Sequence, residues 1–260
     1  MKYLLIFLFF LTLNQEFTPV FELDAHVDLM YRDNLDNLYT VDEYTLKKYD
    51  SKGKLLFTYS DNFLGKISSV SIGEGLKVMV YYQNNAQMVV LDNSLSQLAP
   101  PVALNFYNLG SVSLVCSSSQ NRYWLYDPLQ GSLIRTTNTF TQEFNSGNLD
   151  QILNLSLNPT LMTEWGNVLY LNDPKEGILV FDIFGTYKKT IPLKGLKTFQ
   201  VSEYGIYYLE NGEFKFYDFK SFLIQTVQIP EMKATNALIS NKMLFIKTEK
   251  GISVFNRNTF

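Results

Sequence analysis

The chain has little of what most catalytic and metal centres require. Its 260 residues include one cysteine, Cys116, one histidine, His26, and two tryptophans. A single cysteine excludes an intramolecular disulfide, and one cysteine plus one histidine are too few for a zinc site built from those residue types. A Ser-His-Asp or Cys-His centre would have to use His26. We therefore expect no catalytic residues, no metal site and no cofactor.

The chain also has no large excess of either charge sign and no long apolar run. The 22 basic and 25 acidic residues leave a net charge of −3, which favours neither nucleic acid nor an anionic membrane as a partner. Leu4–Leu13 is apolar but shorter than the roughly 20 residues that a spanning helix needs. Because Lys2 precedes this run and polar residues follow it, residues 1–15 are predicted to be a signal peptide. The missing small-residue cleavage pattern leaves an uncleaved anchor as the alternative, and no spanning segment is expected in residues 16–260.

Aromatic residues, in contrast, are abundant at 15%, with 20 Phe and 17 Tyr, which favours half-buried β-strands. A unit recurs along the chain: a nearly continuous apolar strand, a short polar turn, and a further strand that ends in a turn-forming residue. The turn-forming residues bond their own backbone and need no metal or catalytic role. The ends of these third strands are Asp50, Asp92, Thr136, Asp182, Asp218 and Asn256.

The spacing of these ends indicates the architecture. It runs from 36 residues (Asp182 to Asp218) to 46 residues (Thr136 to Asp182), close to the repeat of four-stranded propeller blades. We predict an all-β, six-bladed β-propeller as a single domain over residues 16–260, with five or seven blades as alternatives. The last unit lacks a fourth strand, and residues 16–23 are predicted to supply it and close the ring. Residues 149–155 are the one helix candidate.

Two single residues are interpreted as structural. Cys116 lies in an alternating run and is expected to be a buried strand residue. His26 lies between Ala25 and Val27 near the predicted closure and is expected to be a strand histidine with its hydrogen bonds satisfied.

The blades resemble those of NHL and YWTD propeller families. The pattern of Asp or Asn, two residues, Gly, and then Ile/Leu-x-Val-Phe-Asp is similar to NHL blades, and Tyr123–Asp127 is similar to the YWTD core with one extra residue. The Phe-rich start and the Lys/Asn/Phe/Tyr-rich composition resemble exported envelope proteins of Bacteroidota. That resemblance implies a location in the periplasm or at the outer-membrane surface, and some propellers of that group are accessories of outer-membrane secretion machinery.

With no catalytic set, the sequence favours a non-enzymatic interaction module that binds a protein partner, such as an envelope or outer-membrane complex. Loops on rigid scaffolds carry binding, and aromatic residues are enriched in interface anchors. The candidate contact residues lie in two links between units: Phe63, Leu64, Phe106, Tyr107 and Leu109.

Two alternatives remain open. Acidic and aromatic loop residues could bind or hydrolyse a carbohydrate, because Asp42, Glu43, Asp173, Glu176, Glu210, Glu213 and Glu249 all fall on the predicted hairpins between second and third strands. Alternatively, the chain could be a purely structural subunit that is stable only in a larger assembly.

Overall fold

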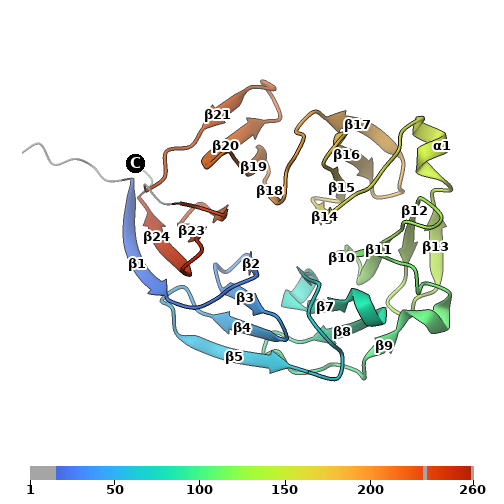
Figure 1. Cartoon of the computed structure of the whole chain (residues 1–260), viewed down its shortest axis with the longest axis horizontal. Coiled ribbons are helices and arrows are strands. Elements are labelled where there is room, and N and C mark those ends of the chain that lie inside the picture. The colour runs from blue at the N-terminus through green and yellow to red at the C-terminus, as the bar shows by residue number, and fades with distance from the viewer. Residues whose placement is uncertain (1–15, 231–232, 259–260) are drawn as a thin grey trace, which may run out of the picture.

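Six antiparallel sheets of four strands each stand around a ring in the computed structural model (Figure 1), which describes residues 16–230 and 233–258. The predicted signal peptide lies outside the described residues. Each sheet is one blade, so the predicted six-bladed propeller is confirmed. Blades 1 to 3 consist of β2 (Leu29–Arg32), β3 (Leu38–Asp42), β4 (Thr45–Tyr49) and β5 (Leu55–Ser60); β6 (Ser69–Ile72), β7 (Val78–Tyr82), β8 (Gln87–Leu91) and β9 (Val102–Ala103); and β10 (Leu114–Ser118), β11 (Arg122–Asp127), β12 (Ser132–Thr136) and β13 (Gln142–Asn145).

Blades 4 to 6 repeat the pattern, with one change in the last. They consist of β14 (Leu161–Trp165), β15 (Val168–Asp173), β16 (Gly177–Asp182) and β17 (Tyr187–Ile191); β18 (Phe199–Val201), β19 (Gly205–Glu210), β20 (Glu213–Asp218) and β21 (Ile224–Thr226); and β22 (Asn236–Ile239), β23 (Met243–Lys247), β24 (Ile252–Arg257) and β1 (Phe17–Leu23). Within the described residues, helical structure is limited to α1 (Leu149–Leu153), which confirms the helix candidate, and to the short 3-10 turns η1 (Glu74–Leu76), η2 (Gln83–Asn85) and η3 (Leu104–Tyr107).

The outer strand of blade 6 comes from the opposite end of the chain. β1 pairs antiparallel with β24, from Phe17 opposite Arg257 to Leu23 opposite Ile252, with a bulge between Pro19 and Phe21. The bulge accommodates a proline that has no N–H to offer the ladder. The predicted closure by residues 16–23 is therefore confirmed, and the ring joins its two ends through backbone hydrogen bonds.

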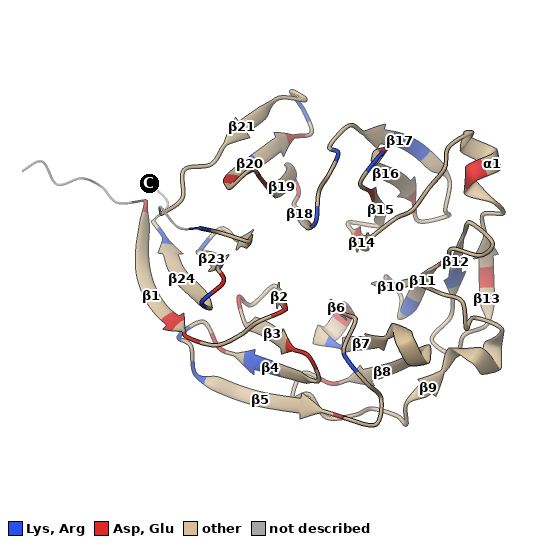
Figure 2. Cartoon of the chain, viewed as in Figure 1, with Lys and Arg blue, Asp and Glu red and all other residues tan. Residues whose placement is uncertain are grey.

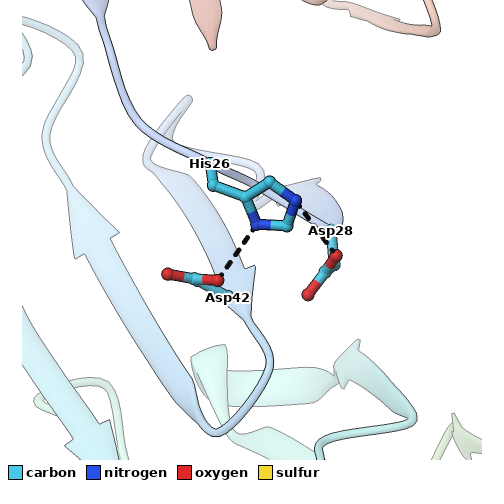
Figure 3. A group of neighbouring side chains, drawn as sticks. All are labelled: His26, Asp28 and Asp42. Atoms are coloured by element: carbon cyan, nitrogen blue, oxygen red, sulfur yellow. Dashed lines mark hydrogen bonds and ion pairs between the residues drawn. The ribbon is translucent and has the colours of Figure 1, made fainter. Parts of the chain in front are cut away.

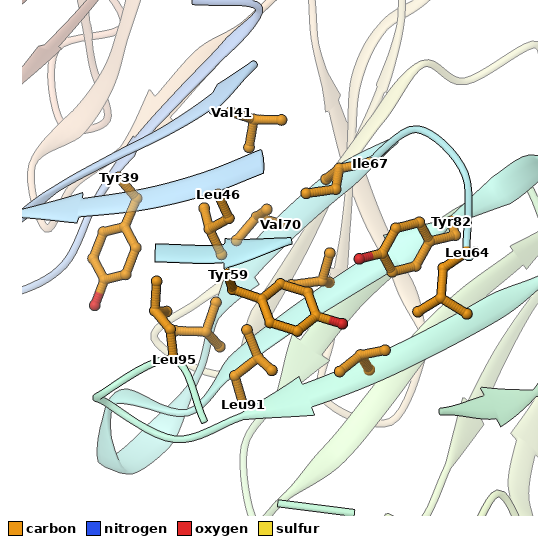
Figure 4. Packing of buried hydrophobic residues seen from close by; sticks show 13 residues of the cluster. Tyr39, Val41, Leu46, Tyr59, Leu64, Ile67, Val70, Tyr82, Leu91 and Leu95 are labelled. Atoms are coloured by element: carbon orange, nitrogen blue, oxygen red, sulfur yellow. The ribbon is translucent and has the colours of Figure 1, made fainter. Parts of the chain in front are cut away.

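The hydrophobic core is divided into layers between neighbouring blades. Figure 4 shows the layer between blades 1 and 2, where Tyr39, Val41 and Leu46 face Val70 and Tyr82. All five residues of β7 are buried, as expected for a strand covered on both faces. Cys116 is likewise buried in β10, and burial raises the pKa of its thiol, so the expected buried strand cysteine is confirmed.

In blades 1, 2, 4 and 5 the turn after the third strand follows the predicted side-chain chemistry, whereas Asn256 lies within β24, opposite Thr18 and Met243, rather than at a turn. The Asp50 carboxylate accepts hydrogen bonds from Lys52 N and Lys54 N, both at 2.9 Å. Backbone N–H and hydroxyl donors from Ser221 hold the pKa of Asp218 below its ordinary value. Blade 3 differs from the prediction, because Thr137 rather than the buried Thr136 makes the turn: its hydroxyl accepts from Thr139 N and Thr141 N.

Charged residues of both signs are scattered over all six blades (Figure 2), in keeping with the net charge of −3. No helix among the described residues is long and apolar enough to cross a membrane.

Candidate functional site

The links between blades and the hairpins between second and third strands share one side of the ring, which we call the link face. Antiparallel strands alternate direction, so every link and every such hairpin emerge at the same end of a blade. Hydrogen bonds connect the two sets around blade 2. Asn85 Nδ2 donates to Leu64 O in the link before that blade, and Leu104 N donates to Ala86 O from the link after it.

The predicted contact residues divide into two groups in the structure. Phe63 is 98% exposed, Phe106 is 87% exposed and Tyr107 is 44% exposed. We call these three residues the link aromatics; Phe63 lies in the link before blade 2, and Phe106 and Tyr107 lie in the link after it. Tyr107 also packs its ring against Phe140, with the ring centroids 5.0 Å apart, so it lies between blades 2 and 3.

Leu64 and Leu109 point the other way. Leu64 lies beside Tyr82 in the layer between blades 1 and 2 (Figure 4), and Leu109 is buried in the layer between blades 2 and 3. A buried core leucine offers no surface to a partner, so neither residue belongs to the candidate contact surface. Each link therefore exposes at least one aromatic ring while it inserts leucine into the core, Leu64 in the first link and Leu104 and Leu109 in the second.

The local sequence explains how the rings are presented. The Asp61 carboxylate accepts a hydrogen bond from Phe63 N at 3.0 Å, which fixes a tight turn with Phe63 at its tip. Asn108 takes a left-handed conformation at the end of η3 and stops the helix directly after Tyr107. The exposed neighbours Asn62 and Asn105 are uncharged amides. Next to Phe63 and Phe106 in the sequence, the exposed polar side chains are thus amides, and the nearby Asp61 carboxylate is engaged by the backbone of the turn.

The acidic residues of the hairpins are mostly engaged by lysines. Glu43 pairs with Lys66 at 2.5 Å, and Lys215 lies 2.7 Å from Glu210 and 3.4 Å from Glu213. Asp173 is buried and accepts backbone N–H bonds within its own hairpin. These contacts draw the carboxylates toward lysines and backbone donors rather than toward one another.

His26 departs from its expected role. It lies in the link between β1 and β2 rather than in a strand, and its side chain is 69% exposed. Its imidazole stands between two carboxylates (Figure 3): Nδ1 is 3.1 Å from Asp42 Oδ1, and Nε2 is 3.8 Å from Asp28 Oδ1. We call His26, Asp28 and Asp42 the closure cluster, because it lies where the chain crosses from blade 6 to blade 1.

An open pocket of about 360 Å³ adjoins the closure cluster. One wall is the link at residues 26–28, and the other is formed by Thr235, Lys247, Thr248 and Glu249 of blade 6. Sequence reasoning missed this arrangement because Asp42 is distant from His26 along the chain. The available signal was the alternation of Asp24, His26 and Asp28, which places acidic groups next to the single histidine.

Comparison with protein-family models and with curated protein sequences finds no match. Solved structures are similar in fold. A streptogramin B lyase structure superposes with a TM-score of 0.59 at 16% identity, covering 90% of this chain and 80% of that one. The extracellular domain of the hybrid two-component system BT3049 from B. thetaiotaomicron gives 0.60 at 14% identity, covering 88% of this chain and 33% of that one. BamB from Moraxella catarrhalis gives 0.56 at 11% identity, covering 93% and 98%. The chain is a six-bladed β-propeller similar in fold to an enzyme, to an extracellular domain and to BamB, and its resemblance to them stops at the fold.

Proposed function

We propose that this chain is an exported, non-catalytic interaction module that binds a protein of a cell-envelope assembly through the link aromatics. The observation that carries the proposal is the near-complete exposure of Phe63 and Phe106, which lie in the links before and after blade 2. Burying one such ring in a partner contributes about 1.5–3 kcal/mol. Aromatic anchors of this kind dominate the binding energy of protein interfaces.

Export rests on the apolar segment at residues 4–13, on the predicted signal peptide over residues 1–15, and on the presence of an extracellular domain among the proteins of similar fold. The chain also needs no disulfide in an oxidising compartment, because its layered core and closed ring already hold it together. The periplasm or the outer-membrane surface is the location that we propose.

The test is affinity purification of the tagged chain from detergent-solubilised envelopes, compared among three forms. The first is the wild type, and the second is the double variant Phe63→Ser, Phe106→Ser. The third is a matched control, Phe184→Ser, Phe222→Ser, which removes two exposed rings from the hairpins between third and fourth strands, at the opposite ends of their blades.

We expect a stoichiometric partner with the wild type and the control, and loss of that partner with the link-face variant. Two rings at the stated burial energy correspond to a loss of at least about 100-fold in affinity. A partner that stays bound to the link-face variant, or leaves both variants equally, would contradict the assigned surface. A wild type that purifies alone would contradict the proposed function.

A second candidate, carbohydrate binding, is favoured by one observation: the exposed rings are flanked by the amides of Asn62, Asn105 and Asn108. Aromatic faces and amide donors together suit the apolar and hydroxyl-bearing surfaces of a sugar. Calorimetric titration of the chain with a panel of glycans tests this candidate. Binding that disappears in Phe106→Ala would favour this candidate, and absence of binding and hydrolysis across the panel would remove it.

A further inference from the structure

We propose that the closure cluster binds one divalent transition-metal ion, with Zn²⁺ as the best match. His26, Asp28 and Asp42 each offer one ligand atom, and the three atoms lie within 4.8 Å of one another. At tetrahedral zinc, bonds of about 2.0–2.2 Å place neighbouring donors roughly 3.3 Å apart. The 3.1 Å between His26 Nδ1 and Asp42 Oδ1 is close to that spacing, whereas Asp28 Oδ1 faces the other ring nitrogen at 3.8 Å. The imidazole therefore has to swing out from between the two carboxylates before one of its nitrogens and both carboxylates share a metal.

The backbone holds both carboxylates in place. Asp42 ends β3, and Asp28 N donates to Val41 O at 2.8 Å, so the link runs alongside that strand. Glu43 N donates to Asp28 Oδ2 at 2.9 Å, which leaves Oδ1 turned toward His26. A ligand oriented by a second hydrogen bond is the usual arrangement around bound metals. Only the exposed imidazole has to rotate.

The charge environment of this cluster differs from that of four other surface carboxylates, which lysines neutralise. Glu43, Glu210, Glu213 and Asp182 each lie within 4 Å of a lysine nitrogen. Among residues 16–230 and 233–258, the one ion-pair partner within that distance of Asp28 and Asp42 is His26. A neutral imidazole with two carboxylates carries a charge of −2, which a divalent cation balances.

The donor set selects the class of metal. Calcium and magnesium take oxygen ligands, whereas an imidazole nitrogen with carboxylate oxygens suits zinc and its first-row neighbours. Three protein ligands leave a fourth position open, and two of the three, His26 and Asp28, line the pocket that Lys247 and Thr248 bound on the other side. Water or an anionic group of a ligand fills such a position in zinc sites with three protein ligands.

The experiment is a calorimetric titration of the metal-free full chain, purified through a tag without histidine, with ZnCl₂. The wild type is expected to bind one equivalent. His26→Ala and Asp42→Asn are expected to weaken binding by at least about tenfold, the scale on which changes around a metal site act. The matched control Glu213→Gln removes an exposed carboxylate that faces Lys215, and it should bind as the wild type does.

Cobalt gives a readout that simple charge attraction does not produce. Co²⁺ in a tetrahedral nitrogen and oxygen site shows intense visible absorption, which we expect with the wild type and not with His26→Ala. Protection of Cys116 from thiol reagents verifies that each variant is folded. Absence of saturable binding by the wild type, or equal binding by His26→Ala, would overturn the proposal. Either result leaves the role of the link aromatics untouched, because the two sites share no residue.

Discussion

Two of the contacts between neighbouring blades, which we call seams, differ in how their polar groups are buried and hydrogen-bonded. Between blades 3 and 4, Glu164 accepts hydrogen bonds from Trp124 Nε1 at 2.7 Å, from Ser119 N at 2.9 Å and from the Ser118 hydroxyl. Arg135 donates to that same hydroxyl and lies over the Trp124 ring. Burial lowers the pKa of Arg135, and the charge of Glu164 opposes that shift. Every polar group of this seam is engaged by a neighbour.

The seam between blades 6 and 1 is open instead. The closure cluster is exposed and faces a pocket, and its histidine bridges two carboxylates that no lysine or arginine pairs within 4 Å among the described residues. The difference distinguishes two uses of polar residues. A sealed and fully bonded group stabilises the ring, because any missing partner would leave a buried charge. An exposed donor set keeps the freedom to exchange its contacts for a ligand.

The largest expected effect is at the sealed seam. Glu164→Ala removes the carboxylate that three donors share, and with it the larger of the two attractive charges that act on buried Arg135, the other being Glu143. We expect a loss of about 3–5 kcal/mol in the free energy of unfolding. At about 2–4 °C per kcal/mol for a domain of this size, the melting temperature falls by on the order of 10 °C. Glu213→Ala, at an exposed position, is the control. A loss below about 1 kcal/mol for Glu164→Ala would break the comparison.

A second buried charge tests the same idea between blades 1 and 2. Lys48 is buried, lies 3.9 Å from Asp33 and donates to Asn93 O at 3.0 Å. Asp33 keeps other donors, including Leu35 N and the Tyr39 hydroxyl. Lys48→Ala leaves a cavity and should cost about 2–4 kcal/mol, whereas Lys48→Met fills the space and should cost less than half as much. Equal losses in both variants, measured by denaturant unfolding, would mean that the charge rather than the packing matters.

The pH dependence of Lys48 has a definite sign. Burial lowers the pKa of Lys48, although the charges of Asp33 and Asp92 partly oppose this shift. Between the lowered folded value and the unfolded value near 10.5, the unfolded chain binds more protons, so this group makes stability rise with pH. Lys48→Met should remove that rise. The measurement is the free energy of unfolding of the wild type and of the variant from pH 7 to pH 10. A difference between the two that stays constant over this range would contradict the assignment.

The smallest expected effect is at the open seam. Without metal, His26→Ala should change the free energy of unfolding by less than about 1 kcal/mol, because an exposed ion pair contributes little. Thermal unfolding in a chelator at pH 7 measures this change. A larger loss would place the closure cluster among the structural groups of the ring and erase the contrast with the Glu164 seam.

The sequence predicted features that depend on neighbouring residues. The third-strand ends at Asp50, Asp92, Asp182 and Asp218 could be predicted because an aspartate accepts hydrogen bonds from the backbone two residues further on and again three or four residues further on. The closing strand could be predicted because the last repeat unit lacked its fourth strand, and residues 16–23 formed a strand that belonged to no unit. The turn in blade 3 was misplaced by one residue, because Thr136 and Thr137 are identical and burial alone distinguishes them.

The candidate sites were only partly readable. The two aromatic links were identified, but Leu64 and Leu109 point into the core, and nothing in a short link tells which apolar residue turns inward. Trp124 and Glu164 are partners across 40 residues, and His26 and Asp42 across 16. Such pairings depend on where each blade places its strand ends, which alternation patterns do not encode.

By itself, the sequence determined the fold class, favoured six blades over five or seven, and located most of the turns and the strand that closes the ring, because hydrophobic alternation and turn chemistry act over a few residues. Only the tertiary structure decided which link residues face solvent, which charges are sealed between blades and which three donors meet beside a pocket. The physical reason is that burial and donor geometry are set by the packing of one rigid blade against the next, over distances along the chain that no local pattern spans.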